Sequence, residues 1–192
     1  MSGVSEMKVA VTGVIGSGKS TVSSYIKELG YPLINADEVN AGLLEDSAVQ
    51  EDIVKLLDLP FFDKKEISGV VFNDPGKKKL LEDYLHPLIK DKIRVFFKKN
   101  KGLCFAEVPL LFEAGWQDEF DYSICVVSYP KRITERLMKE RHMSKEEIKA
   151  RMNSQLSQKE KAERSDFVLK NYGGLELLKK RTEELIERLE ND

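Results

Sequence analysis

Short apolar runs recur along the chain, and the stretches between them carry apolar residues at helical spacing. Five of these runs predict strands, because each is short and ends at polar or turn-forming residues. The strands are expected at residues 8–12, 31–35, 102–108, 122–128 and 167–169. Neighbouring positions within the runs are apolar, as in strands that are covered on both faces. The pattern therefore predicts an α/β fold of three layers, with a five-stranded parallel sheet between helices.

Helices are predicted between these strands, where apolar residues share one face. They are expected at 20–29, from His86-Pro87 onward, at 130–158 and at 175–189. Gly30 ends the first helix, and a proline at position 87 suits the first turn of a helix. The stretch between the second and third strands is too long for an ordinary crossover. We therefore expect a small helical insert, which covers residues 38–85.

A phosphate-binding loop follows the first predicted strand. Residues 13–20, Gly-Val-Ile-Gly-Ser-Gly-Lys-Ser, match the pattern G-x-x-x-x-G-K-[ST], and the match lies between a predicted strand and a predicted helix. The glycines allow successive backbone N–H groups to face one anion, and the following helix adds its positive end. Lys19 would reach the β- and γ-phosphates of ATP, and the Ser20 hydroxyl would bind Mg²⁺. The expected ATP-binding residues of the loop are Gly13, Gly16, Ser17, Gly18, Lys19, Ser20 and Thr21.

The loop alone leaves several functions open. A GTPase is not favoured, because the chain has no N-K-x-D and no D-x-x-G segment. Its 192 residues also leave no room for an oligomeric ATPase module with its own arginine-finger subdomain. A kinase of a small acceptor, such as a nucleoside monophosphate or shikimate, and a nucleotide-binding regulator without enzymatic activity remain as alternatives.

Composition limits the kinds of partner. The 31 Lys and Arg residues are balanced by 33 Asp and Glu, so the net charge of −2 gives no general attraction for nucleic acid. No apolar run reaches the about 18 residues of a membrane span, and no secretory signal is visible, so we expect a cytoplasmic protein without a membrane partner. Cys104 and Cys125 are expected to be buried free thiols, and His86 and His142 have no cysteines at the spacing of a zinc site.

Several further motifs give the chain a specific resemblance. They are Asn35-Ala-Asp37, Phe72-Asn-Asp-Pro75, Leu85-His-Pro-Leu-Ile89, Pro109-Leu-Leu-Phe-Glu113, Arg151-Met-Asn-Ser-Gln155 and Asp166 with Asn171-x-Gly173. With them the sequence resembles the dephospho-coenzyme A kinase family over residues 8 to about 186. The resemblance implies transfer of a phosphoryl group from ATP to the ribose 3′-hydroxyl of dephospho-coenzyme A, which is the last step of coenzyme A synthesis. It also implies ATP and Mg²⁺ as cofactors, and a monomer or weak homo-oligomer.

The resemblance also implies that the chain is divided into three functional parts. A nucleotide-binding core is expected at 7–37, 86–131 and 159–192, a helical coenzyme A-binding insert at 38–85, and a mobile lid at 132–158. Lids of this kind exclude water and bring cations to the transferred phosphoryl group.

Individual roles follow from the same resemblance. The expected catalytic residues are Lys19, Asp37, Arg136 and Arg141, the metal ligands are Ser20 and Glu107, and Asn171 is expected at the adenine. The expected substrate-binding residues are Asp37, Phe72, His86, Pro109, Leu111 and Glu113, with Tyr84 as a further pocket candidate. Simpler alternatives stay open: Asp37 also suits a helix N-cap, Glu107 an ordinary strand end, Asn171 a turn, and Phe72, Tyr84 and Leu111 the core.

The sequence departs from the family pattern in three places. Asn35 replaces the first acid of the usual Asp-Ala-Asp, and Asp63-Lys64 replaces an Asp-Arg pair. In the predicted lid, Glu140 occupies the family's second arginine position and the arginine follows as Arg141. One residue turns a helical side chain by about 100°, so either the helix ends or widens before Arg141, or Arg136 takes over the phosphate contact. We favour the first, because residues 142–144 predict a break and a new N-cap.

Overall fold

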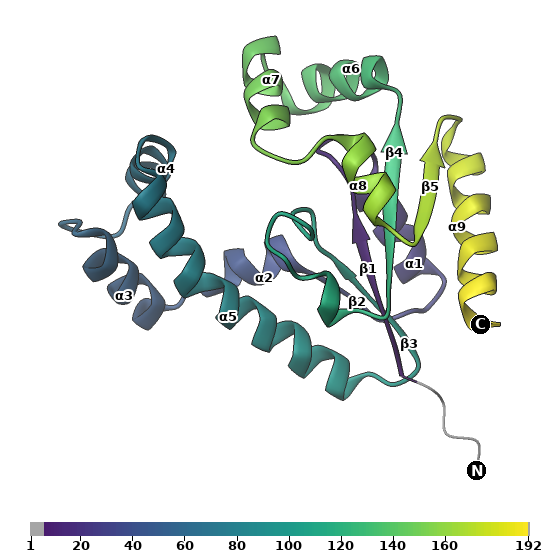
Figure 1. Cartoon of the computed structure of the whole chain (residues 1–192), viewed down its shortest axis with the longest axis horizontal. Coiled ribbons are helices and arrows are strands. Elements are labelled where there is room, and N and C mark those ends of the chain that lie inside the picture. The colour runs from purple at the N-terminus through teal and green to yellow at the C-terminus, as the bar shows by residue number, and fades with distance from the viewer. Residues whose placement is uncertain (1–5, 192) are drawn as a thin grey trace. The chain divides into compact units, whose positions relative to one another are not determined.

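The structure is a computed structural model that describes residues 6–191 (Figure 1). The chain divides into two compact units, one formed by the described residues up to Asn35 together with those from Asn100 onward, and one formed by Ala36–Lys99. Within the described residues, no helix is both long and apolar enough to cross a bilayer.

The first unit contains the predicted parallel sheet. Its strands are β1 (Met7–Thr12), β2 (Leu33–Asn35), β3 (Leu103–Glu107), β4 (Tyr122–Ser128) and β5 (Phe167–Asn171). They pair in the order β2-β3-β1-β4-β5, and every pair is parallel. β1 therefore lies at the centre, where its carboxyl end leads directly into the phosphate-binding loop. This confirms the predicted fold class.

Helices cover the sheet on both sides. The helices of the first unit are α1 (Lys19–Glu28), α6 (Pro130–Arg141), α7 (Lys145–Asn153), α8 (Gln158–Arg164) and α9 (Leu175–Glu190), with a 3₁₀ turn, η1, at Gln117–Glu119. The main core lies between the sheet and two of them, where Val11 and Phe105 pack with Val22 of α1 and Ile186 of α9. α8 contacts β4 (Figure 1). Alternate strand residues point to opposite faces, so each layer has its own set of side chains.

The two cysteines occupy interior positions, as predicted. Cys104 and Cys125 are free and buried. Burial raises the pKa of the Cys125 thiol to about 11, because the thiolate would lose its hydration. Neither thiol therefore resembles an activated nucleophile.

The second unit is entirely helical. It consists of α2 (Ala36–Leu43), α3 (Ser47–Leu57), α4 (Lys64–Asn73) and α5 (Pro75–Lys99), and the first three helices each contact α5. Aspartates cap the starts of α3 and α4: Asp46 accepts from the Ala48 N–H, and Asp63 accepts from the backbone N–H groups of Lys65 and Glu66. Such caps satisfy amide groups that lack partners in the first turn.

One predicted boundary is wrong. A helix was expected to begin at His86-Pro87, but α5 runs unbroken from Pro75 to Lys99 with Pro87 inside it. Its true start is fixed by Asp74, whose carboxylate accepts from the N–H groups of Gly76 and Lys77. The helix tolerates the loss of one hydrogen bond at Pro87 because one of its faces is buried on both sides of the proline, at Leu85, Ile89, Ile93 and Phe97. The compact unit at 36–99 is accordingly longer than the insert expected at 38–85.

The predicted lid segment contains the expected break at 142–144. His142 is left-handed with φ of 52°, and Ser144 forms a capping box with Glu147 at the start of α7. α6, however, continues as a regular helix through Arg141, so the expectation that it ends or widens before Arg141 is wrong. The helix therefore ends at Arg141, and its left-handed C-cap, His142, is the first residue of the expected break.

Candidate active site

The phosphate-binding loop has the conformation that its glycines permit. Gly13, Gly16 and Gly18 have φ values of 145°, 74° and 105°. A Cβ atom on Gly13 would lie 2.5 Å from the backbone oxygen of Val126, and one on Gly18 would lie 2.3 Å from Nδ2 of Asn171. Gly18 is also the N-cap of α1 and offers it no side chain. The amides that begin α1 thus face the loop, where an anion would bind.

Lys19 lies within the loop rather than in solvent. Lys19 is only 7% exposed, and its Nζ donates to the backbone oxygen of Val14 at 3.1 Å. A cation held beside loop amides in this way suits the phosphates of a nucleotide.

Oxygen groups suitable for Mg²⁺ meet at the end of β3. Glu107 is 4% exposed, and its Oε1 lies 3.5 Å from the Ser20 hydroxyl. Its other oxygen, Oε2, accepts from the Ser23 hydroxyl at 2.6 Å. A hydroxyl and a carboxylate are the hard ligands that Mg²⁺ prefers, with waters and substrate phosphates completing its shell. No group of three or more His, Cys, Asp or Glu residues is arranged for a metal within the part of the chain that the structure describes.

Ser23 was missed from the sequence. It lies three residues after Ser20 on α1, and this spacing places both hydroxyls on one helix face. The spacing was therefore the signal that could have identified it.

Two side chains from distant segments hold carbonyl groups of the loop. Arg136, on α6, donates from Nη1 to the Gly16 oxygen at 2.6 Å. Asn171, the last residue of β5, donates from Nδ2 to the Ser17 oxygen at 2.9 Å. Arg141, by contrast, is exposed at the end of α6. Of the two arginines predicted to be catalytic, the structure thus brings Arg136 to the loop.

The loop also shares a small apolar cluster with α6 and α7. Val14 packs with Ile133 and Leu137 of α6 and with Ile148 of α7. A Cβ atom on Gly16 would lie 3.0 Å from Cγ of Leu137. The hydrogen bond from Arg136 to Gly16 is therefore accompanied by close apolar packing between α6 and the loop residues Val14 and Gly16.

An aromatic pair lies beside the segment that follows β5. The rings of Tyr129 and Tyr172 stack at 4.3 Å between centroids. Arg132 donates from Nη1 to the backbone oxygens of Tyr172 and Gly173, each at 3.0 Å. Asn171, the residue expected at the adenine, is itself buried in its contact with the loop.

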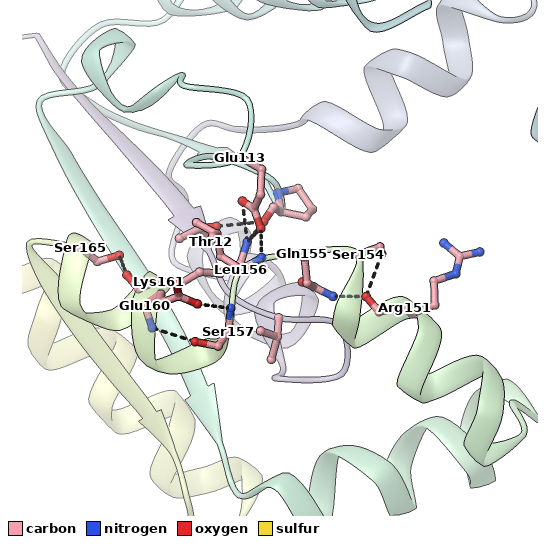
Figure 2. A network of polar contacts seen from close by, with 12 residues as sticks. Thr12, Glu113, Arg151, Ser154, Gln155, Leu156, Ser157, Glu160, Lys161 and Ser165 are labelled. Atoms are coloured by element: carbon pink, nitrogen blue, oxygen red, sulfur yellow. Dashed lines mark hydrogen bonds and ion pairs between the residues drawn. The ribbon is translucent and has the colours of Figure 1, made fainter. Parts of the chain in front are cut away.

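The motif at 109–113 lies in internal contacts. Leu111 is fully buried, which corresponds to the core position left open as an alternative. The Pro109 carbonyl accepts from the Thr12 hydroxyl at 3.1 Å and from Nζ of Lys161 at 2.7 Å. Glu113 pairs with Lys161 at 2.7 Å (Figure 2). Lys161 has no motif around it, and its complete burial was not predicted.

The remaining candidates belong to the second unit. Asp37 is exposed in the first turn of α2, and Phe72, on α4, is 81% exposed. His86 lies on α5, where partial burial lowers its pKa. Tyr84 donates to Oδ2 of Asp52 at 2.8 Å; burial and this carboxylate raise the pKa of Tyr84 to about 12. These residues come from three separate helices of this unit.

A glycine-rich loop at the end of the central parallel strand, a buried lysine and a serine–carboxylate pair define a P-loop phosphotransferase fold. The solved shikimate kinase of Acinetobacter baumannii shares this fold, with a TM-score of 0.57 at 10% identity over 97% of this chain and 94% of that chain.

Comparison with known sequences narrows the class. The sequence model of the dephospho-CoA kinase family matches residues 7–176, and the chain therefore belongs to that family. Dephospho-CoA kinase of Listeria monocytogenes is 34% identical over 192 residues, which cover 94% of this chain and 96% of that protein. Dephospho-CoA kinase of Thermus thermophilus is 32% identical over 177 residues, which cover 90% of this chain and 86% of that protein.

Solved structures agree with the family assignment. A crystal structure from Thermus thermophilus has a TM-score of 0.86 at 31% identity and covers 95% of this chain and 97% of that chain. Dephospho-CoA kinase from Campylobacter jejuni has a TM-score of 0.70 at 30% identity, covering 96% of this chain and 97% of that chain.

Proposed function

We propose that the chain is an ATP-dependent kinase that phosphorylates the ribose 3′-hydroxyl of dephospho-CoA, giving CoA and ADP in the last step of CoA synthesis. One observation carries the proposal: a complete phosphate-binding loop, with Lys19 buried in it and Ser20 beside Glu107, occurs in a member of the dephospho-CoA kinase family.

The loop would bind the phosphates of ATP. Its amides and the N-terminus of α1 face the anion, and Lys19 supplies a mobile positive charge. Ser20 and Glu107 would hold Mg²⁺, which when bound neutralises charge on the β- and γ-phosphates. Arg136 fixes the Gly16 carbonyl and would place its guanidinium near the charge that develops during transfer.

The acceptor side of the reaction would depend on Asp37. The 3′-oxygen forms a bond to the γ-phosphorus, the bond from this phosphorus to the bridging oxygen breaks, and ADP leaves. The hydroxyl proton passes to the Asp37 carboxylate. Because phosphoryl transfer has a loose transition state, the orientation of the hydroxyl contributes more than early removal of its proton.

The rest of the assignment follows the family. The helical residues 38–85 would bind dephospho-CoA, with Phe72 and His86 as contacts, and residues 132–158 would close as a lid over ATP. We place the enzyme in the cytoplasm as a monomer or weak homo-oligomer that needs no other macromolecule for catalysis.

A coupled ADP-release assay across four acceptors tests the proposal. Dephospho-CoA, AMP, CMP and shikimate are each supplied with ATP and Mg²⁺, and Lys19→Met serves as the inactive control. We expect dephospho-CoA to be the one acceptor of the four that raises ADP release above the rate without acceptor. Faster release with another acceptor would change the substrate assignment, and ATP binding without transfer to any acceptor would instead indicate a nucleotide-binding regulator.

A further inference from the structure

A buried ion pair joins α8 to the segment that follows β3. Lys161 is 0% exposed, and its Nζ lies 2.7 Å from Oε1 of Glu113, 2.9 Å from Oε2 and 2.7 Å from the Pro109 oxygen. Glu113 is itself only 19% exposed at its side chain. Lys159 and Glu163, on the same helix, pair at 3.7 Å with side chains that are 84% and 62% exposed.

The buried pair connects two further parts of the first unit (Figure 2). The Pro109 oxygen also accepts from the hydroxyl of Thr12, the last residue before the phosphate-binding loop. Glu113 accepts from the backbone N–H of Leu156 at 2.8 Å. Leu156 lies in the short linker between α7 and α8, which is the C-terminal end of the proposed lid.

Along this linker, the polar contacts are first made with the end of α7 and then, from Leu156 onward, with Glu113 and α8. Ser154 and Gln155 both donate from their side chains to the Arg151 oxygen, so these residues stay attached to the end of α7. Leu156 instead donates to Glu113, and the following residue, Ser157, forms a capping box that begins α8. A lid that moves with α7 would therefore turn between Gln155 and Leu156.

Stability alone does not account for such a pair. Removing two charges from water offsets most of their attraction, and apolar residues of similar size often serve as well or better. The pair fixes geometry, because the single Glu113 side chain contacts both Lys161 and the Leu156 amide and so joins α8 to the linker before it.

We propose that Glu113 and Lys161 are positioning residues that anchor the C-terminal hinge of the lid at Leu156 and attach it to the residue preceding the phosphate-binding loop. Neither residue contacts substrate in this proposal, which rests on the kinase function and lid proposed above. The anchor would let the lid close to one position, so that the acceptor hydroxyl rather than water receives the phosphoryl group.

Two kinds of variant separate positioning from stability. Glu113→Gln removes one charge, and the double change Glu113→Leu with Lys161→Met removes both and fills the space with apolar groups. Because no unpaired charge remains in the double variant, we expect its melting temperature to be close to that of the unmodified protein. Lys159→Met with Glu163→Leu is the matched control on the exposed face of α8.

The kinetic expectation is a loss of turnover with unchanged substrate binding. In both Glu113 variants we expect kcat to fall by about 10-fold to 100-fold, the scale of a displaced closing element. KM for ATP and dephospho-CoA should change by less than about twofold, because neither variant removes a contact that either substrate makes in the ground state. ATP hydrolysis without acceptor should form a larger share of turnover, and the control should behave as the unmodified protein does.

Hydrogen exchange gives a readout that does not depend on the reaction. With ATP bound, the Leu156 amide should exchange at least about 10-fold faster in the double variant, while the amides of β4 should not change. Normal turnover, or unchanged Leu156 exchange, in the folded double variant would overturn the proposal. A selective rise in KM for dephospho-CoA in Glu113→Gln would instead make Glu113 a substrate ligand. If the unmodified protein failed to phosphorylate dephospho-CoA, the kinase function would fail, whereas the exchange result would still decide the hinge.

Discussion

Replacing Arg136 by alanine removes the guanidinium that α6 brings to the phosphate-binding loop. The lost contact is a 2.6 Å bond from Nη1 to the Gly16 oxygen, and it is partly buried. A hydrogen bond from a charged donor contributes about 2 kcal/mol, so the binding conformation of the loop should become about 30-fold less favourable. In the proposed mechanism Arg136 also places a positive charge near the transferred phosphoryl group, and arginines in such a position contribute about 10³-fold or more to turnover.

We therefore expect Arg136→Ala to lower kcat by about 10³-fold while KM for ATP rises by about 30-fold or less. The coupled ADP-release assay with saturating dephospho-CoA measures both constants, and thermal unfolding checks that the variant is folded. Arg136→Lys keeps the charge but not the planar fork, so it should recover only part of the loss.

Arg141→Ala is the matched control, because Arg141 lies on the same helix but is exposed at its end. Its turnover should change by less than about threefold, as for other exposed charges. A severe loss in Arg141→Ala with a normal Arg136→Ala would refute this reasoning. The lid would then have to rearrange on closing so that the displaced arginine of the family motif reaches the phosphates.

Three further changes test the loop and the acceptor side. Lys19→Ala should reduce turnover by about 10³-fold and weaken ATP binding; a folded variant with near-normal turnover would contradict the role of the loop. Asp37→Asn should lose turnover while the Kd for ATP, measured by calorimetry, stays nearly constant; a collapse of ATP binding would instead place Asp37 at the nucleotide. Gly13→Ala should lower the free energy of unfolding in urea by about 2–5 kcal/mol, because it combines a positive φ with a Cβ 2.5 Å from the Val126 oxygen. Gly30→Ala has a positive φ but no atom within 4 Å, so it should cost only about 1–2 kcal/mol, and equal costs at both sites would exclude the steric argument.

The features that were predicted correctly from the sequence are set by residues close to one another along the chain. The apolar runs defined all five strands, and the spacing of Gly13, Gly18 and Lys19 defined the loop, because both patterns are local. The break at 142–144 was equally local, since Ser144 and Glu147 form a recognisable capping box.

The start of α5 shows how a local signal can mislead. Pro87 suits a first turn, but Pro75 does so as well, and Asp74 before it is the better cap. The choice between them depends on packing over the following turns, where Ile89 and Ile93 are buried on one face. A proline within the helix costs one hydrogen bond, which this buried face offsets.

Contacts between distant segments could not be predicted from motifs. Lys161 lies in a charged helix that resembles any solvated surface helix, yet it is fully buried against Glu113. Nothing near it in sequence indicates this burial, because its partner comes from the segment after β3. The contact from Arg136 to Gly16 joins residues 120 positions apart, against 48 for Lys161 and Glu113, so motifs could not show which of the two arginines of α6 contacts the loop.

Glu107 and Glu113, the two carboxylates near the end of β3, differ in how far their surroundings could be predicted from the sequence. Strand side chains alternate between faces, so Glu107 lies on the same face as Phe105, which packs in the core with α1. The position of Glu107 beside Ser20 and Ser23 therefore follows from alternation once α1 is known to cover that face. Glu113 lies beyond the strand, where alternation no longer applies, and its direction is set by the buried cation that reaches it. An acid at the end of a strand can thus be assigned to a phosphate-binding loop from sequence, whereas an acid in the following loop can be assigned only after its partner is found.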